Sequence, residues 1–355
     1  LVTLYGEAPV NQFGDHFTPL YYLLAPLYLL VGDARALLVI QALFLGLAAI
    51  PLYLLARQLL PGRSTALSVA LAASFLLHPA LHGVNTFDFH EIALAPMLLL
   101  WALVCLESGR TRLMLVFLGL AMLAKEEVAL SVAAIGLYLW LFGARARLGL
   151  LISGVALAYF GAVTFVIMPA LGGGPDLARF AGLAAADDAG LLALLSGVLS
   201  NPVYAFSQVF LNPEKLAFLA LLFLPVVFTP LRARARWLTA VPAFSVALLA
   251  STPVQYSIEY HYPAIMLPFV YYLAAAGLRR GQLQPRTAAG LDAPARRAPA
   301  AAAVAILVAS LAMNWQYGWL LGKRYQPPPQ ADAHRQALVA LLEAVPPQAA
   351  VSTLS

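Results

Sequence analysis

The residues best suited to chemistry in this sequence lie in a short polar stretch, "FDFHE", at positions 87–91. Asp88, His90 and Glu91 offer hard oxygen and imidazole ligands of the kind that Mg²⁺ or Mn²⁺ accepts. A bound metal would clamp a phosphate or pyrophosphate leaving group, and a remaining carboxylate could take a proton from an attacking hydroxyl. The alternative is plain loop polarity, with Glu91 acting as a favourable partner for a helix N-terminus.

More ionisable groups lie in other connecting segments of the chain. They are Asp15 and His16, then Lys125, Glu126 and Glu127, and finally Glu259 and His261. Lys125 could hold a phosphate or pair with Glu126, while Glu127 is expected to be a structural interface residue. Because these groups flank apolar runs, we expect them to converge on one recessed cavity.

The elements that must position these groups are transmembrane helices. The chain has 355 residues, of which 62% are hydrophobic and only 10% are charged, with a mean hydropathy of +0.83. A soluble domain is closer to half apolar and a quarter charged, so the composition indicates an integral membrane protein. The net charge of +5 comes from short basic clusters between apolar runs, which is typical of membrane topology and not of a nucleic-acid partner.

About ten apolar runs are long enough to suggest membrane spans. They cover residues 36–56, 64–80, 91–106, 112–124, 128–142, 148–169, 215–231, 237–251, 262–278 and 299–320. The Pro-interrupted run 17–32 is better explained as an interfacial or re-entrant helix. The predicted fold is therefore an all-α polytopic helix bundle, placed in the bacterial inner (cytoplasmic) membrane.

Loop charge orients the bundle. Most of the 21 Lys and Arg residues fall in alternate loops, which the positive-inside rule places in the cytoplasm. The same rule favours a hairpin of two short helices over residues 112–142, because one long helix would place Lys125, Glu126 and Glu127 at the bilayer centre. A charge at that depth costs about 3 kcal/mol or more.

This layout gives one membrane domain and one further module. Residues 1–320 form the polytopic domain, with outer loops at 1–35, 81–90, 170–214 and 252–261. Residues 321–355 are predicted to begin an extracytoplasmic soluble module. The opening at Leu1 and the ending "AAVSTLS" suggest a fragment cut at both ends.

The alternation of Phe87 and Phe89 with Asp88 and His90 carries its own prediction. In an extended segment, successive side chains point to opposite sides. We therefore expect the two phenyl rings to anchor in apolar packing while the acid and the imidazole face the cavity. Carboxylates gathered there need a cation, or Lys125, to offset their charge.

Three motifs carry a resemblance to a known family. "FGDHFTPLYYLLAPLY", "NTFDFHEIALAP" and "LAKEEVAL", in this order, resemble an uncharacterised family of bacterial predicted membrane proteins with a domain of unknown function. That family is distantly similar to the GT-C glycosyltransferases, which take a sugar from a polyprenyl-phosphate donor at the outer face of the membrane. The resemblance covers essentially the whole chain, but a helix and an aspartate that usually precede this region are not in it.

The resemblance implies roles for individual residues. Asp15, Asp88 and Glu126 would be the catalytic bases or metal ligands, and His16, Lys125 and His261 would bind substrate. Asp88, His90 and Glu91 would hold Mg²⁺ or Mn²⁺, and the partners would be a lipid-linked sugar donor and membrane lipids. The alternatives are a transporter or flippase, in which such acids relay protons or bind cations, and a non-catalytic membrane scaffold.

Overall fold

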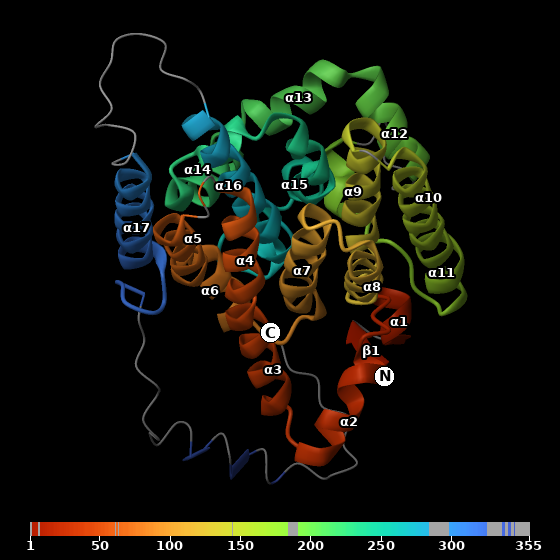
Figure 1. Ribbon diagram of the computed structural model, residues 1–355. Coiled ribbons are helices and arrows are strands. Elements are labelled where there is room, and N and C mark those ends of the chain that lie inside the picture. Colours follow the sequence, from red (N-terminus) through yellow and green to blue (C-terminus); the bar gives the residue numbers. More distant parts are fainter. Residues whose placement is uncertain are drawn as a thin grey trace, which may run out of the picture.

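The chain is described by a computed structural model that is almost entirely helical (Figure 1). It describes residues 2–324 except positions 6, 7, 61, 63 and 144 and the ranges 184–190 and 284–297, together with positions 336, 337, 340, 341 and 344. Strands β1 (Val2–Tyr5) and β2 (Ala8–Asn11) form an antiparallel hairpin. The module expected at 321–355 lies outside the described residues beyond position 324, apart from those single positions.

The first half of the chain is a succession of helices joined by short connections. They are α1 (Gln12–Asp15), α2 (Tyr21–Val31), α3 (Arg35–Leu47), α4 (Ala49–Leu59), α5 (Thr65–Leu77), α6 (Pro79–Thr86), the 3₁₀ turn η2 (Glu91–Leu94), α7 (Ala95–Glu107), α8 (Thr111–Met122) and α9 (Val128–Phe142).

The second half alternates long helices with short turns. Its helices are α10 (Ala146–Ala162), the π-turn η3 (Val163–Ile167), α11 (Met168–Ala170), α12 (Leu191–Ser200), α13 (Pro202–Phe210), α14 (Pro213–Phe223), α15 (Val241–Leu249), α16 (Leu267–Leu283) and α17 (Ala298–Tyr317). The 3₁₀ turns are η4 (Ala178–Leu183), η5 (Leu224–Val226), η6 (Thr229–Arg232), η7 (Arg234–Thr239), η8 (Pro253–Tyr256) and η9 (Tyr262–Ile265).

In the part of the chain that the structure describes, fewer helices are long enough to cross a membrane than the ten spans expected from the sequence. Each of the ten expected ranges contains a helix. Within the described residues, however, only Arg35–Leu59, Ala146–Ala170 and Pro299–Tyr317 are long and apolar enough to cross a bilayer unaided. Two bent helix pairs, Thr65–Leu77 with Pro79–Thr86 and Pro202–Phe210 with Pro213–Val226, raise the total to as many as five.

Helix α2 matches the expectation of a short interfacial or re-entrant element. Its 11 residues give about 16 Å of helix, well short of a hydrocarbon core of about 30 Å. Most of its apolar side chains are exposed, and Leu29 and Leu30 are 77% and 83% exposed. In Figure 1 it lies at the lower edge of the bundle, ahead of α3.

The predicted hairpin over residues 112–142 is confirmed. Helices α8 and α9 are separated by a break that carries Lys125, Glu126 and Glu127. The Arg145 guanidinium, just beyond the end of α9, contacts the Thr111 hydroxyl at the start of α8. The two ends of this segment therefore lie together, and the charged break lies at its turn.

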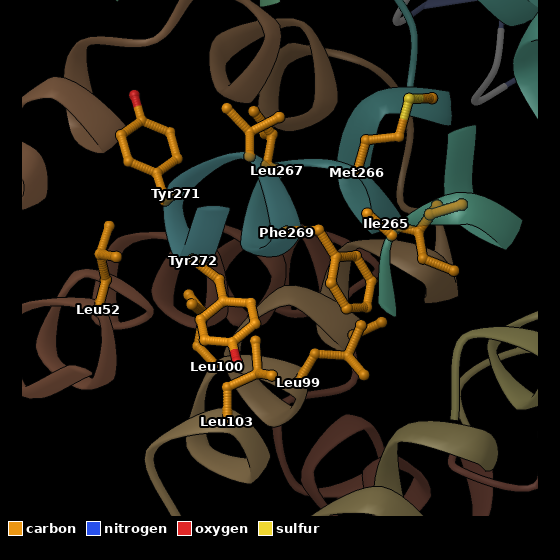
Figure 2. Packing of buried hydrophobic residues seen from close by; sticks show 14 of the residues in the cluster. Leu52, Leu99, Leu100, Leu103, Ile265, Met266, Leu267, Phe269, Tyr271 and Tyr272 are labelled. Carbon is orange, nitrogen blue, oxygen red and sulfur yellow. The ribbon is translucent and has the colours of Figure 1, made fainter. Parts of the chain in front are cut away.

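Helix α16 is the centre of the core. The hydrophobic residues from Leu267 to Ala275 are fully buried. They include the aromatic side chains of Phe269, Tyr271 and Tyr272. Figure 2 shows leucines of α4 and α7 packed around these rings. At one end of this core, Glu107 accepts a hydrogen bond from the Tyr272 hydroxyl at 2.7 Å and pairs with Arg236 at 3.1 Å.

Proline breaks in the apolar interior are supported by polar side chains. The Ser310 hydroxyl lies 3.1 Å from the Pro225 carbonyl oxygen, and the His78 ring, next to Pro79, lies 3.2 Å from the Leu222 carbonyl oxygen. Carbonyl groups freed from a helical ladder need such partners where water is excluded. These buried polar groups therefore stabilise the bends.

The range 170–214, expected as an outer loop, contains two apolar helices. Helices α12 and α13 carry large exposed apolar side chains, including Leu199, Val203 and Phe206 at 78%, 76% and 59% exposure. A water-exposed loop would not present such a surface. This part of the chain therefore presents apolar faces suited to lipid.

Candidate functional site

One cavity of about 920 Å³ collects most of the predicted chemistry. It is lined by Gln12, Asp15, His16, Tyr21, Leu24, Ala25, Tyr28, Ala34, Leu37, Phe87, Asp88, Phe89, His90, Glu91, Lys125, Asp176, Arg179, Gln255, His261 and Tyr262. Of the residues given a catalytic, substrate-binding or metal-binding role from the sequence, only Glu126 is not in the lining, and it contacts His16. Glu127 and Glu259, which were expected to join the cavity, are also outside the lining and pair with Arg179 and Arg324. The ionisable groups of four separate segments thus converge on one space.

The turn between α8 and α9 organises this site, because each of its three charged residues holds a different segment. Lys125 is almost fully buried, and its ammonium nitrogen lies 3.3 Å from the Glu91 carboxylate at the start of η2. The Tyr21 hydroxyl of α2 donates a hydrogen bond of 3.0 Å to the other oxygen of Glu91. One buried ion pair therefore joins α2, η2 and the hairpin turn.

Glu126 fixes the N-terminal segment. Its carboxylate accepts a hydrogen bond of 3.0 Å from the backbone N–H of Phe17 and lies 3.4 Å from Nδ1 of His16. The other ring nitrogen of His16 lies 3.5 Å from the ammonium of Lys125. His16 is therefore held between a carboxylate and an ammonium, at the wall of the cavity.

Glu127 fixes the loop that follows α11. Its carboxylate pairs with the Arg179 guanidinium at 3.5 Å, and Arg179 also donates a hydrogen bond of 2.8 Å to the Asp176 carbonyl. The Arg179 carbonyl in turn accepts a hydrogen bond of 2.7 Å from the Ser251 N–H. The expectation that Glu127 is a structural interface residue agrees with these contacts.

The glycines of "LGGG" bring the same loop against α1. The N–H of Gly174 donates a hydrogen bond of 3.0 Å to the carbonyl of Gly14. A Cβ on Gly173 would lie 2.0 Å from that same carbonyl oxygen, so only glycine allows this approach. The loop is thereby held beside Asp15 and His16.

The "FDFHE" segment forms the wall of the cavity, as predicted, but its side chains do not alternate. The Phe87 ring lies 5.1 Å from the His90 ring and 5.5 Å from the His261 ring, so Phe87 faces the same cluster as the imidazoles. Phe87, Asp88 and Phe89 all line the cavity. The prediction of alternation was wrong because the segment turns into η2 and is not a paired strand.

The conformation of this segment is held by a buried amide on α3. Gln41 accepts a hydrogen bond of 2.9 Å from the His90 N–H and donates one of 3.2 Å to the Val84 carbonyl. The His90 ring stacks on the His261 ring with centroids 3.8 Å apart and an interplanar angle of 16°. Two connecting segments, 87–91 and 257–262, therefore meet at this stack.

Burial and neighbouring charges set the protonation of the site. Burial would lower the pKa of Lys125, but the Glu91 carboxylate, with Glu127 and Glu126, holds it above the ordinary value. Burial would raise the pKa of Glu126, yet its hydrogen bond to His16 and the Lys125 charge bring it below the ordinary value. Both groups are therefore ionised at neutral pH.

The three cavity histidines differ from one another. Burial and the Lys125 charge act to lower the pKa of His16, but Glu126 outweighs them and the pKa is raised. Burial lowers the pKa of His90, and burial together with the nearby His90 and Lys125 lowers that of His261 to about 2. The stacked pair is therefore neutral, whereas His16 is the imidazole that tends to carry a proton.

Two of the three residues proposed to bind a metal, His90 and Glu91, contact other groups of the protein. No three His, Cys, Asp or Glu side chains in the described part of the chain lie close enough to hold a metal ion together. Glu91 pairs with Lys125, and Nδ1 of His90 lies 3.0 Å from the Asp88 backbone carbonyl oxygen. The sequence led us to expect that either a bound cation or Lys125 would offset the charge of the carboxylates, and Lys125 does so for Glu91. Mg²⁺ or Mn²⁺ at Asp88, His90 and Glu91 stays a prediction.

Several residues that line the cavity or hold its wall in place were not identified from the sequence. Arg179 was hidden in a Gly/Ala-rich stretch, and Tyr21, Gln41 and Gln255 lie in or next to apolar runs. A possible signal was their polarity: Gln41 is a single amide in an otherwise apolar run, and Gln255 follows the Ser251-Thr252-Pro253 turn. The polarity of these residues does not indicate which residues they contact, so their place in the site could not be predicted from the sequence.

The sequence matches one protein family over nearly its whole length. Residues 2–355 fit the family described as "Predicted membrane protein (DUF2079)". Searches of curated proteins and of solved structures found no match.

Proposed function

The chain belongs to the predicted membrane protein family DUF2079, and we propose that its cavity is the active site of a GT-C-like membrane glycosyltransferase. The donor would be a sugar linked to polyprenyl phosphate, and the acceptor would lie at the outer face of the cytoplasmic membrane. The family match supports membrane residence, while the geometry of the cavity is our argument for the reaction.

The observation that carries this proposal is the mixed lining of the cavity. Apolar side chains come from α2 and the start of α3, with Leu24, Ala25 and Leu37. The outer side of α2 is itself exposed and apolar, which suits contact with lipid. Charged groups from other segments line the same cavity. A ligand with a long apolar chain and a charged, hydroxylated head fits such a cavity.

The cations of the cavity lining suit a phosphate. Lys125 and Arg179 both line the cavity and both are largely buried, with side chains 5% and 14% exposed. In a site screened from water such charges interact strongly with a phosphate oxygen. His16 lies beside Lys125 in the lining, and its raised pKa favours a further positive charge there. These residues would hold the donor's phosphate and stabilise the polyprenyl phosphate as it leaves.

Two carboxylates remain for proton transfer. Within the described residues, Asp15 and Asp88 line the cavity and form no ion pair, whereas Glu91 and Glu126 are held by Lys125 and His16. An unpaired carboxylate near an acceptor hydroxyl can act as a general base. We therefore assign the base to Asp15 or Asp88, and to Glu126 a positioning role through His16.

In the proposed reaction the sugar moves from the donor phosphate to the acceptor oxygen. The acceptor oxygen forms a bond to the anomeric carbon of the sugar, and the bond from that carbon to the phosphate oxygen breaks. The electron pair leaves with the polyprenyl phosphate, beside Lys125 and Arg179. The acceptor's proton goes to the carboxylate of Asp15 or Asp88.

The test is transfer by the purified, reconstituted full chain. Proteoliposomes would receive polyprenyl-phosphate-linked hexoses with a labelled sugar, together with a lipid and glycan acceptor mixture. We expect release of polyprenyl phosphate and labelled product. Translocation of the donor without cleavage would favour the flippase alternative, and neither transfer nor translocation would favour a scaffold.

A further inference from the structure

A buried amide without a hydrogen-bond partner lies in the cavity lining. Gln255, in η8, is only 4% exposed, and its amide oxygen has no hydrogen-bond partner among the described residues. Leaving such a group unpaired lowers the stability of the folded state. A residue that lowers stability in this way, at the wall of a cavity, indicates that something other than the protein satisfies it.

The same connecting segment carries a second unpaired polar atom. Nδ1 of His261 is buried and has no hydrogen-bond partner within the described residues, although its ring is well packed. The ring stacks on His90 at 3.8 Å and contacts the Tyr262 ring at 4.1 Å. His261 therefore offers an unused hydrogen-bonding atom on a ring that its neighbours hold in place.

This combination has a definite chemistry. An amide is an acceptor and a donor of two hydrogen bonds, and rotation about its last side-chain bond exchanges its oxygen and nitrogen. Phe87 and Tyr262, which line the cavity beside the two imidazoles, provide aromatic rings. Vicinal hydroxyl groups on one side and a C–H face on the other are the features of a pyranose ring. A phosphate has neither, and it would be held by Lys125 and Arg179.

We propose that Gln255 and the stacked His90–His261 pair form the sugar-recognition subsite of the cavity. Gln255 and Nδ1 of His261 bond to the hydroxyl groups of a hexose, and the aromatic rings of Phe87 and Tyr262 pack on its apolar face. This inference rests on the proposed function, because it places the sugar of that reaction. It makes Gln255 a specificity residue and not part of the proton transfer.

The experiment separates recognition from structure by means of a Gln255→Met variant, which keeps the shape but removes the amide. Tm of the purified full chain in detergent would be measured without ligand and with up to 100 mM glucose, galactose or N-acetylglucosamine. Sorbitol at equal concentration measures the general stabilisation by polyols. We expect Gln255→Met to have an unchanged or higher Tm without sugar, and to lose the sugar-specific gain that the wild type shows.

Two results would overturn the inference. One is a lower Tm of Gln255→Met without sugar, which would mean that the amide supports the fold. The other is an equal sugar-specific gain in the variant and the wild type. A His261→Phe variant, which keeps a ring face but removes the nitrogen atoms, should lose part of the gain.

Kinetics distinguish this inference from the proposed function. If the wild type transfers sugar, Gln255→Met should raise KM for the donor or acceptor about 10-fold or more, with a smaller change in kcat. Unchanged KM would reject the subsite and leave the transferase proposal standing. Absence of transfer by the wild type would reject the transferase proposal, while the sugar-dependent Tm would still decide the subsite.

Discussion

The ammonium of Lys125 lies 3.3 Å from the carboxylate of Glu91, and both side chains are only 5% exposed. Residues 34 positions apart in the sequence thus compensate each other's charge at the wall of the cavity. Their neighbours extend the contact, since Glu126 holds His16 and Glu127 holds Arg179. The order of the whole site therefore depends on one short turn.

Breaking the buried pair should be costly. Glu91→Gln leaves the Lys125 ammonium buried without its main counter-charge, so we expect the free energy of unfolding to fall by about 3–5 kcal/mol. Thermal unfolding in detergent would show this as a lower Tm. The double variant Glu91→Gln with Lys125→Met should recover much of the loss. Additive losses in the double variant would contradict the pairing.

Gly173 lies so close to Gly14 that a substitution there can be compared with the same substitution at Gly174. Gly173→Ala places a methyl group 2.0 Å from the Gly14 carbonyl oxygen, whereas a Cβ on Gly174 meets nothing within 4 Å. We expect Gly173→Ala to destabilise the protein by about 1–3 kcal/mol and Gly174→Ala to have little effect. Equal Tm values for the two variants would mean that the loop does not pack on α1.

The stacked imidazoles predict a pH dependence. The pKa of His261 is far below 6.5 in the folded protein, so the unfolded chain takes up a proton that the folded protein does not as the pH falls below 6.5. Its contribution to stability is present above pH 6.5 and decreases by about 2 kcal/mol between pH 6.5 and 5.

The raised pKa of His16 acts in the opposite direction, with a contribution present below pH 6.5 and lost as the pH rises. A comparison of variants isolates the His261 effect. Tm of His261→Phe should fall less between pH 6.5 and 5 than Tm of the wild type. Parallel curves would show that His261 does not stay neutral in the folded state.

The orientation of the cavity can be tested by thiol labelling. Cysteines at Thr86 and Pro175 should react with an impermeant reagent added to intact cells, and a cysteine at Arg234 should not. The prediction follows from the basic loops on the Arg234 side of the bundle. Labelling at Arg234 from outside would place the cavity at the cytoplasmic face. The single native cysteine, Cys105, is buried and should give little background.

Apolar runs and loop charges were sufficient to predict the helices in the ten apolar ranges and the hairpin turn at Lys125. They did not predict α6, α12 and α13, which lie largely in ranges expected as outer loops. They predicted that the acids and histidines converge, because groups at helix ends on one side of a bundle share a small space. They could not pair Lys125 with Glu91 in preference to Glu126, since that choice depends on packing around η2. The apolar runs also did not predict where α7 begins. It starts at Ala95 and not at Glu91, because Glu91–Leu94 forms a 3₁₀ turn.

Roles within the site were beyond the sequence for a similar reason. Asp15, Asp88 and Glu126 were equivalent as acids until the structure showed that only Glu126 is held by a histidine and a backbone N–H. Arg179 and Gln255 carry no motif, and their place in the lining depends on the loop contacts to Glu127 and on the turn after α15. Tertiary contacts, and not local pattern, assign these residues.

The most direct test of the account is single-turnover sugar transfer by matched carboxylate variants in proteoliposomes. Release of polyprenyl phosphate would be followed for the wild type, Asp15→Asn, Asp88→Asn and Glu214→Gln, the last being an acid outside the cavity lining. Loss of the general base should slow transfer by about 10²-fold or more in Asp15→Asn or Asp88→Asn, with Tm unchanged and Glu214→Gln fully active. Transfer at the wild-type rate in both cavity variants would contradict the account.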